Sequence, residues 1–473
     1  MMPSRVAWPI LCFLVTTIAC AEVVVESLAV GSITVAPDSV ALLLGDSAQF
    51  TAAVQDLSGR TVDNRTVHWA SNDPRVARIS SDGMVTATGT GFTTITAESE
   101  GHSYEAVVTV TVELTSISAG LAHTCGTTST GRTACWGANG DGELGDGTIF
   151  SSRSPVLVID SVPLVSVTAG GTQTCGLTEG GDAYCWGANW SAQLGTGQVD
   201  MDNHAAPVEV SGHGVYELLA LGHRHACASS VVGTISCWGG GVLGQLGNGT
   251  ATSVCPAVPE PCNPTPVGVS GSIRFRSVAA GRDYSCGISD TGEAFCWGDN
   301  TFGMLGDGTA VSRSVPTRVL GGLSFSSVTA GNWHTCGLTA AGEAYCWGIN
   351  NSGQLGTGSL NDSPTPQPVT GGISFDAISA GGEFTCGLAS DGTAFCWGSN
   401  SRGELGNGSL TPSSVPLPVA GGFSLSSLDA GRKHVCAIAV FGTAFCWGHN
   451  RSGQLGAGPA AGYLVPTRVS GQI

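Results

Sequence analysis

The first region in which apolar and polar residues alternate runs from position 27 to position 113. It contains no Cys and consists of short runs that alternate every second residue, such as those around Ile33, Trp69 and Ile95, separated by turn residues. A period of two is typical of half-buried strands, and short strands between turn signals are typical of a β-sandwich. We therefore predict an all-β sandwich over residues 27–113.

From position 115 onward the pattern repeats about every 50 residues. Each of seven copies contains Cys-Trp-Gly, a second Cys ten positions before that Cys, a Gly five positions earlier still, and a Leu-Gly-x-Gly turn after the Trp. The cysteine pairs are Cys125 and Cys135, Cys175 and Cys185, Cys227 and Cys237, Cys286 and Cys296, Cys336 and Cys346, Cys386 and Cys396, and Cys436 and Cys446. A repeat of this length made of short strands predicts an open stack or a closed propeller.

The ten-residue spacing of the paired cysteines fits a β-hairpin. If Cys336 and Cys346 are directly opposed, the strands are joined by Ala340, Ala341 and Gly342, and the last of these takes a left-handed conformation. Gly occupies that position in all seven copies. Opposed residues of a non-hydrogen-bonded pair can form a disulfide, and each such loop closure is worth roughly 2 to 3 kcal/mol on the chain-entropy model.

Metal binding is the alternative explanation of these cysteines. Four copies carry His two residues before the first Cys, and three copies carry another residue. The residues at this position are His123, His225, His334 and His434, and then Gln173, Tyr284 and Phe384. This variation disagrees with a shared ligand role, and zinc sites favour shorter Cys spacings. We expect disulfides and no metal site.

The two ends of the repeat array indicate a ring. A Pro-x-x-Val strand follows every hairpin, and the last one begins at Pro466, close to Ile473. No polar capping repeat is visible, as an open stack requires. We expect the last strand to complete the first blade and to remove two exposed edges. Residues 115–473 are therefore predicted to form a seven-bladed β-propeller that is closed by its C-terminal strand.

Residues 1–21 have the layout of a secretory leader, in which Arg5 precedes an apolar stretch and small residues. Two cleavage sites compete, an A-x-A site ending at Ala21 and a lipoprotein box ending at Cys20. When Cys12 in the leader is set aside, 16 of the 17 other cysteines form close pairs, and Cys20 is left over. An unpaired Cys at the junction favours lipidation, and plain secretion is the alternative. We expect an exported protein in either case.

The first domain resembles the bacterial Ig-like domain of group 2. The segments that carry the likeness are ITVAP from Ile33, LGD from Leu44, VHWASN from Val67, VARI from Val76 and GMVTA from Gly83. The resemblance implies an Ig-like sandwich that acts as a spacer or an adhesive unit. We expect a stalk that holds the next domain off the surface, and we assign no site to it.

The repeats resemble the regulator of chromosome condensation repeat. The likeness covers residues 115–473 and is carried by segments such as AGNWHTCGL from Ala330, CWGIN from Cys346 and GQLG from Gly353. The family's eukaryotic archetype is a nuclear exchange factor for a small GTPase that also docks on chromatin, and bacterial relatives include a secreted β-lactamase inhibitor. The resemblance therefore implies protein binding. The leader and the acidic charge disagree with a nuclear role, and no exchange-site residue can be placed on this chain.

Composition and charge exclude several classes of protein. With 71 Gly and only 11% charged residues, long coiled coils and acidic disordered tails are ruled out. After the leader, no apolar run reaches the ~20 residues that span a bilayer. The 18 Lys and Arg against 35 Asp and Glu give a net charge of −17, which has the wrong sign for a phosphate backbone. We expect no nucleic-acid partner.

The sequence offers no catalytic constellation. It contains no Ser/His/Asp order, nucleophile elbow, phosphate loop or dinucleotide fingerprint. The run from Asn139 to Glu143 looks superficially like a calcium loop, but the equivalent residues 350–354 lack the acids. We interpret it as an ordinary turn and the repeated Trp as packing between blades. We expect no enzyme, no cofactor and no metal.

A functional surface is expected where the copies differ. Blade two carries a longer loop at residues 198–204, and blade three carries an insert at residues 252–265 with its own pair, Cys255 and Cys262. Both occupy the same point of the repeat, so we expect them on one face of neighbouring blades. Loops on a rigid scaffold concentrate binding residues, and a tolerated insertion without a partner is the alternative. The candidate binding residues are Trp190, Met201, Asp202, His204, Val258 and Glu260.

These observations predict a non-catalytic binding protein, secreted or tethered to the outer surface through lipidated Cys20. An Ig-like stalk would present the propeller, as a monomer, to an extracellular protein or glycan. The alternative is an inhibitor or regulator of an extracellular enzyme, for which Met201 and Trp190 are the candidate apolar anchors. Exchange-factor activity rests on the family resemblance alone, and export disagrees with it.

Overall fold

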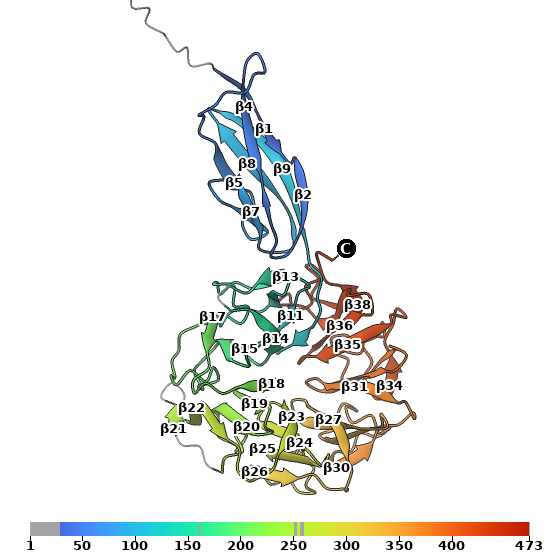
Figure 1. The fold of residues 1–473 in the computed structure, drawn as a ribbon. Coiled ribbons are helices and arrows are strands. Elements are labelled where there is room, and N and C mark those ends of the chain that lie inside the picture. Colours follow the sequence, from blue (N-terminus) through green and yellow to red (C-terminus); the bar gives the residue numbers. More distant parts are fainter. Residues whose placement is uncertain (1–28, 160–161, 250–252, 256–259, 473) are drawn as a thin grey trace, which may run out of the picture.

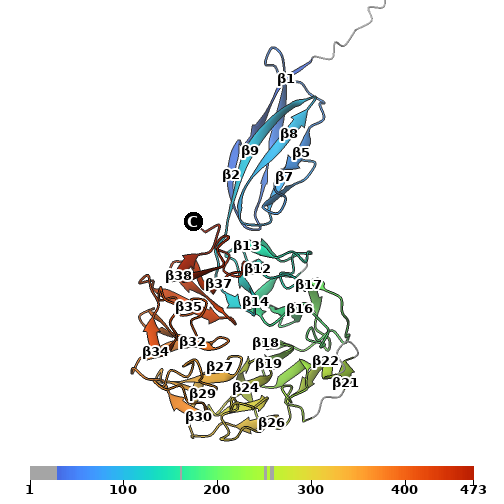
Figure 2. The ribbon, with the colours of Figure 1, turned by 180° about the vertical axis from the view of Figure 1, so that it is seen from behind.

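The computed structural model describes residues 29–159, 162–249, 253–255 and 260–472. These residues form a β-sandwich followed by a ring of seven blades (Figures 1 and 2). Within these ranges no helix is long and apolar enough to cross a membrane. The leader with Cys20, and Val258 in the insert of blade three, lie outside the described residues. The predicted fold class, an all-β chain with an Ig-like sandwich and a seven-bladed propeller, is confirmed.

The sandwich is built from nine strands. They are β1 (Val30–Ala36), β2 (Ser39–Leu43), β3 (Ser47–Gln49), β4 (Thr51–Asp56), β5 (His68–Ser71), β6 (Ala77–Ile79), β7 (Met84–Ala87), β8 (Gly91–Ser99) and β9 (His102–Thr111). The sheets have the orders β2-β9-β8-β5, β3-β7-β6 and β1-β4. Alternate residues such as Ile95 and Val108 are fully buried, which agrees with the period of two in the sequence.

Each blade is an antiparallel sheet of consecutive strands. Blade one has β10 (Ser118–Ala119), β11 (His123–Thr127), β12 (Thr133–Gly137) and β13 (Ser152–Leu157), and blade two has β14 (Leu164–Ala169), β15 (Gln173–Thr178), β16 (Ala183–Gly187) and β17 (His204–Glu209). Blade three has β18 (Tyr216–Leu221), β19 (His225–Ser230), β20 (Ile235–Gly240), β21 (Ser253–Cys255) and β22 (Glu260–Gly268). In every blade the first strand is the innermost of the ring.

The remaining four blades repeat the four-stranded plan. Blade four has β23 (Phe275–Ala280), β24 (Tyr284–Ser289), β25 (Ala294–Gly298) and β26 (Arg313–Arg318), and blade five has β27 (Phe325–Ala330), β28 (His334–Thr339), β29 (Ala344–Gly348) and β30 (Ser363–Pro368). Blade six has β31 (Phe375–Ala380), β32 (Phe384–Ala389), β33 (Ala394–Gly398) and β34 (Ser413–Pro418), and blade seven has β35 (Leu425–Ala430), β36 (His434–Ala439), β37 (Ala444–His449) and β38 (Gly462–Arg468).

The cysteine hairpin has the predicted register. Cys336 lies opposite Cys346 in the pair β28 and β29, and the strands are joined by the expected three-residue loop. Gly342 ends this loop with a φ of 78°, and the equivalent Gly of every blade has a positive φ. The same opposition of two cysteines recurs in the six other blades.

All seven predicted hairpin disulfides are present, with Cα atoms 4.0–4.2 Å apart. The half-cystines are fully buried, and each disulfide packs in a hydrophobic cluster between its own blade and the repeated Trp of the next blade. The bonds join Cys125 to Cys135, Cys175 to Cys185, Cys227 to Cys237, Cys286 to Cys296, Cys336 to Cys346, Cys386 to Cys396 and Cys436 to Cys446.

The repeated Trp packs on the preceding blade, as interpreted from the sequence. Trp186 is fully buried, and its indole N–H donates to the carbonyl of Glu143 at 2.8 Å. A Cβ on Gly145 would lie only 2.8 Å from the Trp186 ring nitrogen, so the turn needs Gly at this point. The equivalent indole–carbonyl bond recurs between five further pairs of blades.

The prediction that the C-terminal strand completes the first blade is wrong. β38 pairs with β37 inside blade seven, and blade one has its own outer strand, β13. Each Pro-x-x-Val strand folds back on the Cys-Trp-Gly strand that precedes it, so every repeat is a complete sheet. The strand that the sequence reading missed is the innermost one, such as β27, which comes just before the repeated Gly.

A closed circle of backbone hydrogen bonds joins the blades instead. The residue after the repeated Gly in each blade donates its N–H to a carbonyl of the next blade, over distances of 2.9–3.4 Å. The series includes the bond from Arg432 to Gly120, 3.1 Å long, which joins blade seven to blade one. Complete blades therefore close the ring through their inner turns.

The carboxylate of Asp429 reinforces this closing seam. One of its oxygens accepts hydrogen bonds from the Ala119 N–H at 2.8 Å and from the Ser118 hydroxyl at 3.3 Å, both in blade one. The other oxygen accepts from the Ser379 hydroxyl of blade six at 2.9 Å. Burial raises the pKa of Asp429, and these hydrogen bonds oppose that shift. A single side chain thus links three consecutive blades.

The sandwich packs directly against the ring. One hydrophobic cluster contains Leu114 at the end of the sandwich, Trp136 of blade one and Val469 after β38. The Thr90 N–H also donates to the carbonyl of Pro155 in β13 at 3.1 Å. The Ig-like domain is therefore held at blades one and seven by a shared core and by backbone hydrogen bonds (Figure 1).

Candidate functional site

Every blade presents two kinds of loop at one end of the ring. One is the tight turn after the innermost strand, such as residues 331–333, and the other is the loop that follows Cys-Trp-Gly, such as residues 349–362. We call this end the insert face, because the long loops of blades two and three belong to it. The opposite end, the hairpin face, carries the cysteine hairpin loops such as residues 340–342.

The expectation that both long loops lie on one face is confirmed. Cys255 and Cys262 form a disulfide, and β21 pairs with β22 to extend blade three. Cys255 and Cys262 pack against Ala192 and Val199 of blade two. The Gly197 N–H also donates to the Pro264 carbonyl at 2.8 Å. The two loops thus form one surface across neighbouring blades.

The candidate binding residues differ in their accessibility. Met201 is 69% exposed, and Asp202 is exposed beside it. His204 is half-buried, and its Nε2 lies 2.9 Å from the Asp200 carboxylate, which keeps it within its own loop. Trp190 is half-buried. A carboxylate oxygen of Glu260 lies 3.6 Å from the Arg224 guanidinium, so this residue connects the insert with the inner turn of blade three.

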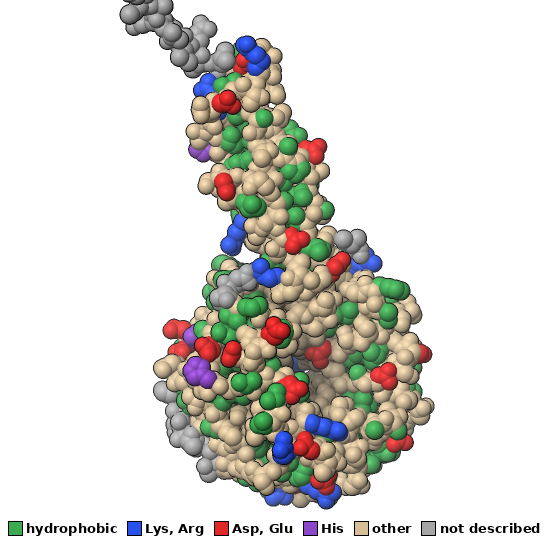
Figure 3. Space-filling model, viewed as in Figure 1, with side chains coloured by type: hydrophobic (Ala, Val, Ile, Leu, Met, Phe, Trp, Pro, Cys, Tyr) green, Lys and Arg blue, Asp and Glu red, His purple; other side chains and the backbone are tan. Residues whose placement is uncertain are grey.

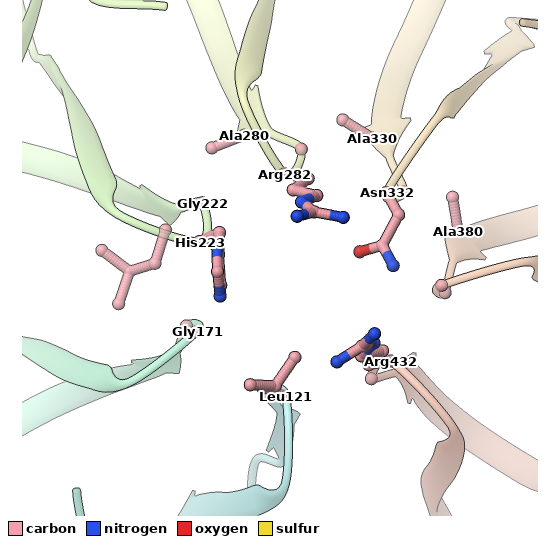
Figure 4. A pocket seen from close by; sticks show the side chains of 18 of the residues that line it. Leu121, Gly171, Gly222, His223, Ala280, Arg282, Ala330, Asn332, Ala380 and Arg432 are labelled. Carbon is pink, nitrogen blue, oxygen red and sulfur yellow. The ribbon is translucent and has the colours of Figure 1, made fainter. Parts of the chain in front are cut away.

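The inner turns surround an open pore mouth that the sequence reading missed. The pore mouth is lined by the repeated glycines and by the residues after them. These following residues are Leu121, Gly171, His223, Arg282, Asn332, Gly382 and Arg432. The side chains of His223, Arg282, Asn332 and Arg432 point toward the centre of the opening (Figure 4). The space-filling view also shows the ring hollowed at its centre (Figure 3).

A signal for this site is present in the sequence. The Gly five residues before each first Cys is invariant, whereas five residue types occur at the position after it in the seven copies. A residue that varies between copies of a repeat is not required for the common fold, so its position is a candidate for a binding surface. The next position, which holds Trp333 in blade five, varies as well, so the alignment of copies alone does not assign either position to the pore.

Positive charge dominates the pore mouth. Burial, and then the charges of Arg224, Arg282 and Arg432, lower the pKa of His223 to about 4. Arg282 Nε lies 3.3 Å from the Asp283 carboxylate. Across the part of the chain that the structure describes, Arg432 has no side-chain hydrogen bond or ion pair. His223 is thus a neutral polar group at neutral pH, beside cationic neighbours.

The histidines before the first cysteines are framework residues. Each is fully buried, with Nε2 2.8–2.9 Å from a hydroxyl of the next blade, as between His123 and Thr174. Thr174 donates its own proton to the Glu143 carbonyl, so the His123 ring nitrogen is the donor to Thr174. Because the paired cysteines are disulfides, these histidines do not share a metal with them. The described residues hold no cluster of three or more metal-ligating side chains.

The turn that looked like a calcium loop uses its polar groups internally. The Asn139 side-chain oxygen accepts from the Leu144 N–H at 2.8 Å, and its amide donates to the Thr148 and Phe150 carbonyls. The Glu143 carboxylate accepts from the Asp141 N–H at 2.9 Å. The Asn350 side chain makes the same bonds in blade five, where residues 350–354 contain no Asp or Glu. The interpretation as an ordinary turn is confirmed.

Three protein families match the chain. The RCC1-like domain matches residues 115–422, and the regulator of chromosome condensation (RCC1) repeat matches residues 442–472. The bacterial Ig-like domain (group 2) matches residues 29–112.

Similarity to individual proteins covers shorter stretches. The chain is 31% identical to the ultraviolet-B receptor UVR8 of Arabidopsis thaliana over 107 residues, 22% of this chain and 23% of the receptor. It is 35% identical to the human probable E3 ubiquitin-protein ligase HERC4 over 98 residues, 21% of this chain and 9% of the ligase. The chain thus spans a quarter or less of these curated relatives.

Solved structures resemble the propeller over most of its length. Prp20p from Saccharomyces cerevisiae superposes with a TM-score of 0.62 and 21% identity, over 76% of this chain and 87% of Prp20p. Human WBSCR16 superposes with a TM-score of 0.63 and 20% identity, over 72% of this chain and 91% of that protein. At these identities the likeness shows the fold.

Proposed function

Because the chain belongs to the RCC1-like domain family, we propose that it is a non-catalytic, exported binding protein that presents the insert face of its propeller to an extracellular protein or glycan. The observation that supports this most directly is the distribution of variation. Trp, Gly, Cys and His recur as buried framework, whereas the long loops and the pore mouth differ between blades and lie together on the insert face. A rigid scaffold with one irregular face suits recognition.

Two observations support export. The described residues form eight disulfides, and such bonds persist in oxidising compartments. The Ig-like domain matches a bacterial module of group 2 and packs on the ring at blades one and seven. The sandwich therefore holds the propeller in a fixed orientation. Lipidation of Cys20 would tether this assembly to a membrane, and cleavage at Ala21 would release it.

Enzyme inhibition is the second candidate function, and one exposed side chain favours it. Met201 is 69% exposed on the loop of blade two, beside the insert of blade three. A flexible apolar side chain on a supported loop can enter a pocket of a partner. Trp190 is half-buried and is therefore the weaker of the two predicted anchors.

The experiment that tests the proposed function removes the insert. Residues 253–263 are shortened to the loop length of the later blades, and partners are captured from envelope and culture-medium proteins with the purified full chain. We expect capture to be lost and the melting temperature of the ring to be unchanged, because the shortened loop keeps a residue opposite Gly239, where Asn263 pairs in the parent chain, and the rest of the insert lies outside the repeated framework. An equal number of substitutions in residues 409–415 of blade six is the control. Capture of the same partner with unchanged affinity by the shortened chain would contradict the proposal.

A further inference from the structure

The pore mouth concentrates cationic groups on an acidic protein. The whole chain has 18 Lys and Arg against 35 Asp and Glu. Arg282 and Arg432 nevertheless reach into one opening from blades four and seven (Figure 4). The charged groups that act on the intervening His223 are all positive, and they help to lower its pKa. Groups of one sign around a concave opening focus the field and attract an anion.

Most side-chain hydrogen-bond donors in the pore mouth have no partner within the chain. Among the described residues, the side chains of Arg432, Asn332 and His223 have no hydrogen-bond partner. Arg282 is the exception, because its Nε lies 3.3 Å from the Asp283 carboxylate. Asp429 is not among the residues that line the mouth, and its oxygens accept hydrogen bonds from Ser118, Ala119 and Ser379. The guanidinium of Arg432 is therefore available to an external anion.

The backbone under these side chains is fixed. The circle of hydrogen bonds between consecutive blades passes through Arg282, Asn332 and Arg432, whose N–H groups bond to the next blade at 3.1–3.4 Å. A ligand that enters the mouth thus meets donors on a preorganised frame, and binding orders only their side chains.

The size of the mouth limits the ligand to one small group. Its volume is about 100 Å³, which is room for several waters, since one water needs roughly 10–15 Å³ on the same measure. A single carboxylate or sulfate group fits, whereas a chain of sugar rings needs an extended groove. The ligand group must therefore stand at the tip of a side chain or a terminus.

The aromatic residues beside the mouth favour a protein over a glycan. The Arg282 guanidinium lies over the Trp333 ring, 5.1 Å from its centroid, and Phe302 packs against Trp333 edge-on at 6.5 Å. One face of Trp333 is therefore covered and cannot stack on a sugar. Arg and Trp side by side, with Phe302 40% exposed, are typical of the anchors of protein interfaces.

We propose that the pore mouth binds the carboxylate of an acidic side chain that a partner protein inserts into it. Arg432 and Arg282 supply the charge, and Asn332 and His223 supply further hydrogen bonds. This inference rests on the proposed function, because it names the chemistry by which the insert face recognises its partner. Arg–carboxylate pairs are strong and directional, which suits a site of this size.

The test uses a fluorescent hexaglutamate peptide as the probe and a hexaglutamine peptide as its uncharged match. Fluorescence anisotropy with the full chain at low salt should show binding of the first peptide and not of the second. Arg432→Gln should weaken binding at least tenfold. Asn332→Asp, which places a carboxylate in the mouth without removing either Arg, should do the same. Arg318→Gln on the hairpin face, where Arg318 pairs with Glu293, is the control and should bind normally.

Three results would overturn the inference. The first is equal binding of the two peptides, and the second is binding of hexaglutamate that neither pore variant changes. The third is binding of a heparin-derived oligosaccharide in place of hexaglutamate, because the site would then be one for the sulfate groups of a glycan. The chain with shortened residues 253–263 separates this inference from the proposed function, because its pore is intact. It should bind hexaglutamate normally even though it captures no partner.

Discussion

The histidines that precede four of the first cysteines couple the stability of the ring to pH. Burial lowers the pKa of His123 to about 4, and burial lowers the pKa of His225, His334 and His434 to about 3. Their Nδ1 atoms have no partner in the described structure, so a second proton would find no acceptor. The unfolded chain protonates these rings near pH 6.5. The folded chain therefore loses stability as the pH falls from 6.5 toward 4.

We predict that His434→Gln makes this pH dependence shallower. The free energy of unfolding from urea titrations between pH 6 and 4.5 should change by about 1.4 kcal/mol less per pH unit than in the parent chain. Gln fits the site, because blade two carries buried Gln173 at the same position. His68→Gln, at an exposed side chain of the Ig-like domain, is the control and should leave the slope unchanged. An unchanged slope in His434→Gln would show that this imidazole is protonated in the folded ring.

Single residues also show how far a functional site can be inferred from the sequence. The variable insert with Cys255 and Cys262 was identifiable because it changes the length of the repeat. Arg282 and Arg432 do not change the length of the repeat, because each is a single residue that follows the invariant Gly. Only the circular arrangement of the turns brings these two residues, which are 150 positions apart in the sequence, into one opening.

At the scale of elements, the strands with strong local signals were predictable and the innermost strands were not. The hairpin of β28 and β29 is specified by Cys spacing and by Gly342 in a left-handed turn. The innermost strand β27 has the sequence FSSVTA, in which only Phe325 is fully buried. Ser326 is exposed and the four side chains after it are only half-buried, so the alternation of apolar and polar residues is weak there. Because the sequence pattern does not reveal this strand, it places the strand at Pro466 in the wrong blade.

The hairpin register predicts the disulfide map of the protein. Non-reducing peptide mapping should link Cys336 to Cys346 and should find the equivalent pair in each blade, because opposed Cα atoms about 4 Å apart bring the two sulfurs together. The double substitution of Cys336 and Cys346 by Ala should lower the free energy of unfolding by roughly 2 to 3 kcal/mol. Links between blades, or free thiols at these positions, would contradict the register.

At the scale of the whole molecule, the closing seam combines several weaker contacts. Trp136 of blade one covers Gly456 of blade seven, but its indole N–H has no partner among the described residues, unlike the six other repeated Trp. The seam keeps the contact between His434 Nε2 and the Thr124 hydroxyl at 2.9 Å, which three other junctions share, and it adds Asp429, which joins three blades. The Ig-like domain shares the core of this seam. The sandwich thus stabilises the junction between blades seven and one, which no loop of the polypeptide connects directly.

The C-terminal segment is structural for a reason other than strand exchange. β38 is the outer strand of blade seven, and Val469, which is 1% exposed, fills the core shared with the Ig-like domain. The carbonyl of Gly471 accepts the Val112 N–H at 2.7 Å and so ties the sandwich to the tail. Removal of residues 465–473 would expose the edge of β37 and would open this core.

We predict that deletion of residues 465–473 lowers the melting temperature by at least about 5 °C and promotes aggregation. The loss of Val469 alone costs about 1.5–3 kcal/mol of burial, and each kcal/mol corresponds to roughly 2–4 °C in a domain of about 200 residues. Scanning calorimetry and size-exclusion chromatography measure the two effects. Val465→Thr, at a side chain that is 42% exposed on β38, keeps the strand and should unfold like the parent chain. If the shortened chain melted at the parent temperature as a monomer, the shared core would not hold the seam, and the backbone circle through Gly120 and Arg432 would have to close the ring unaided.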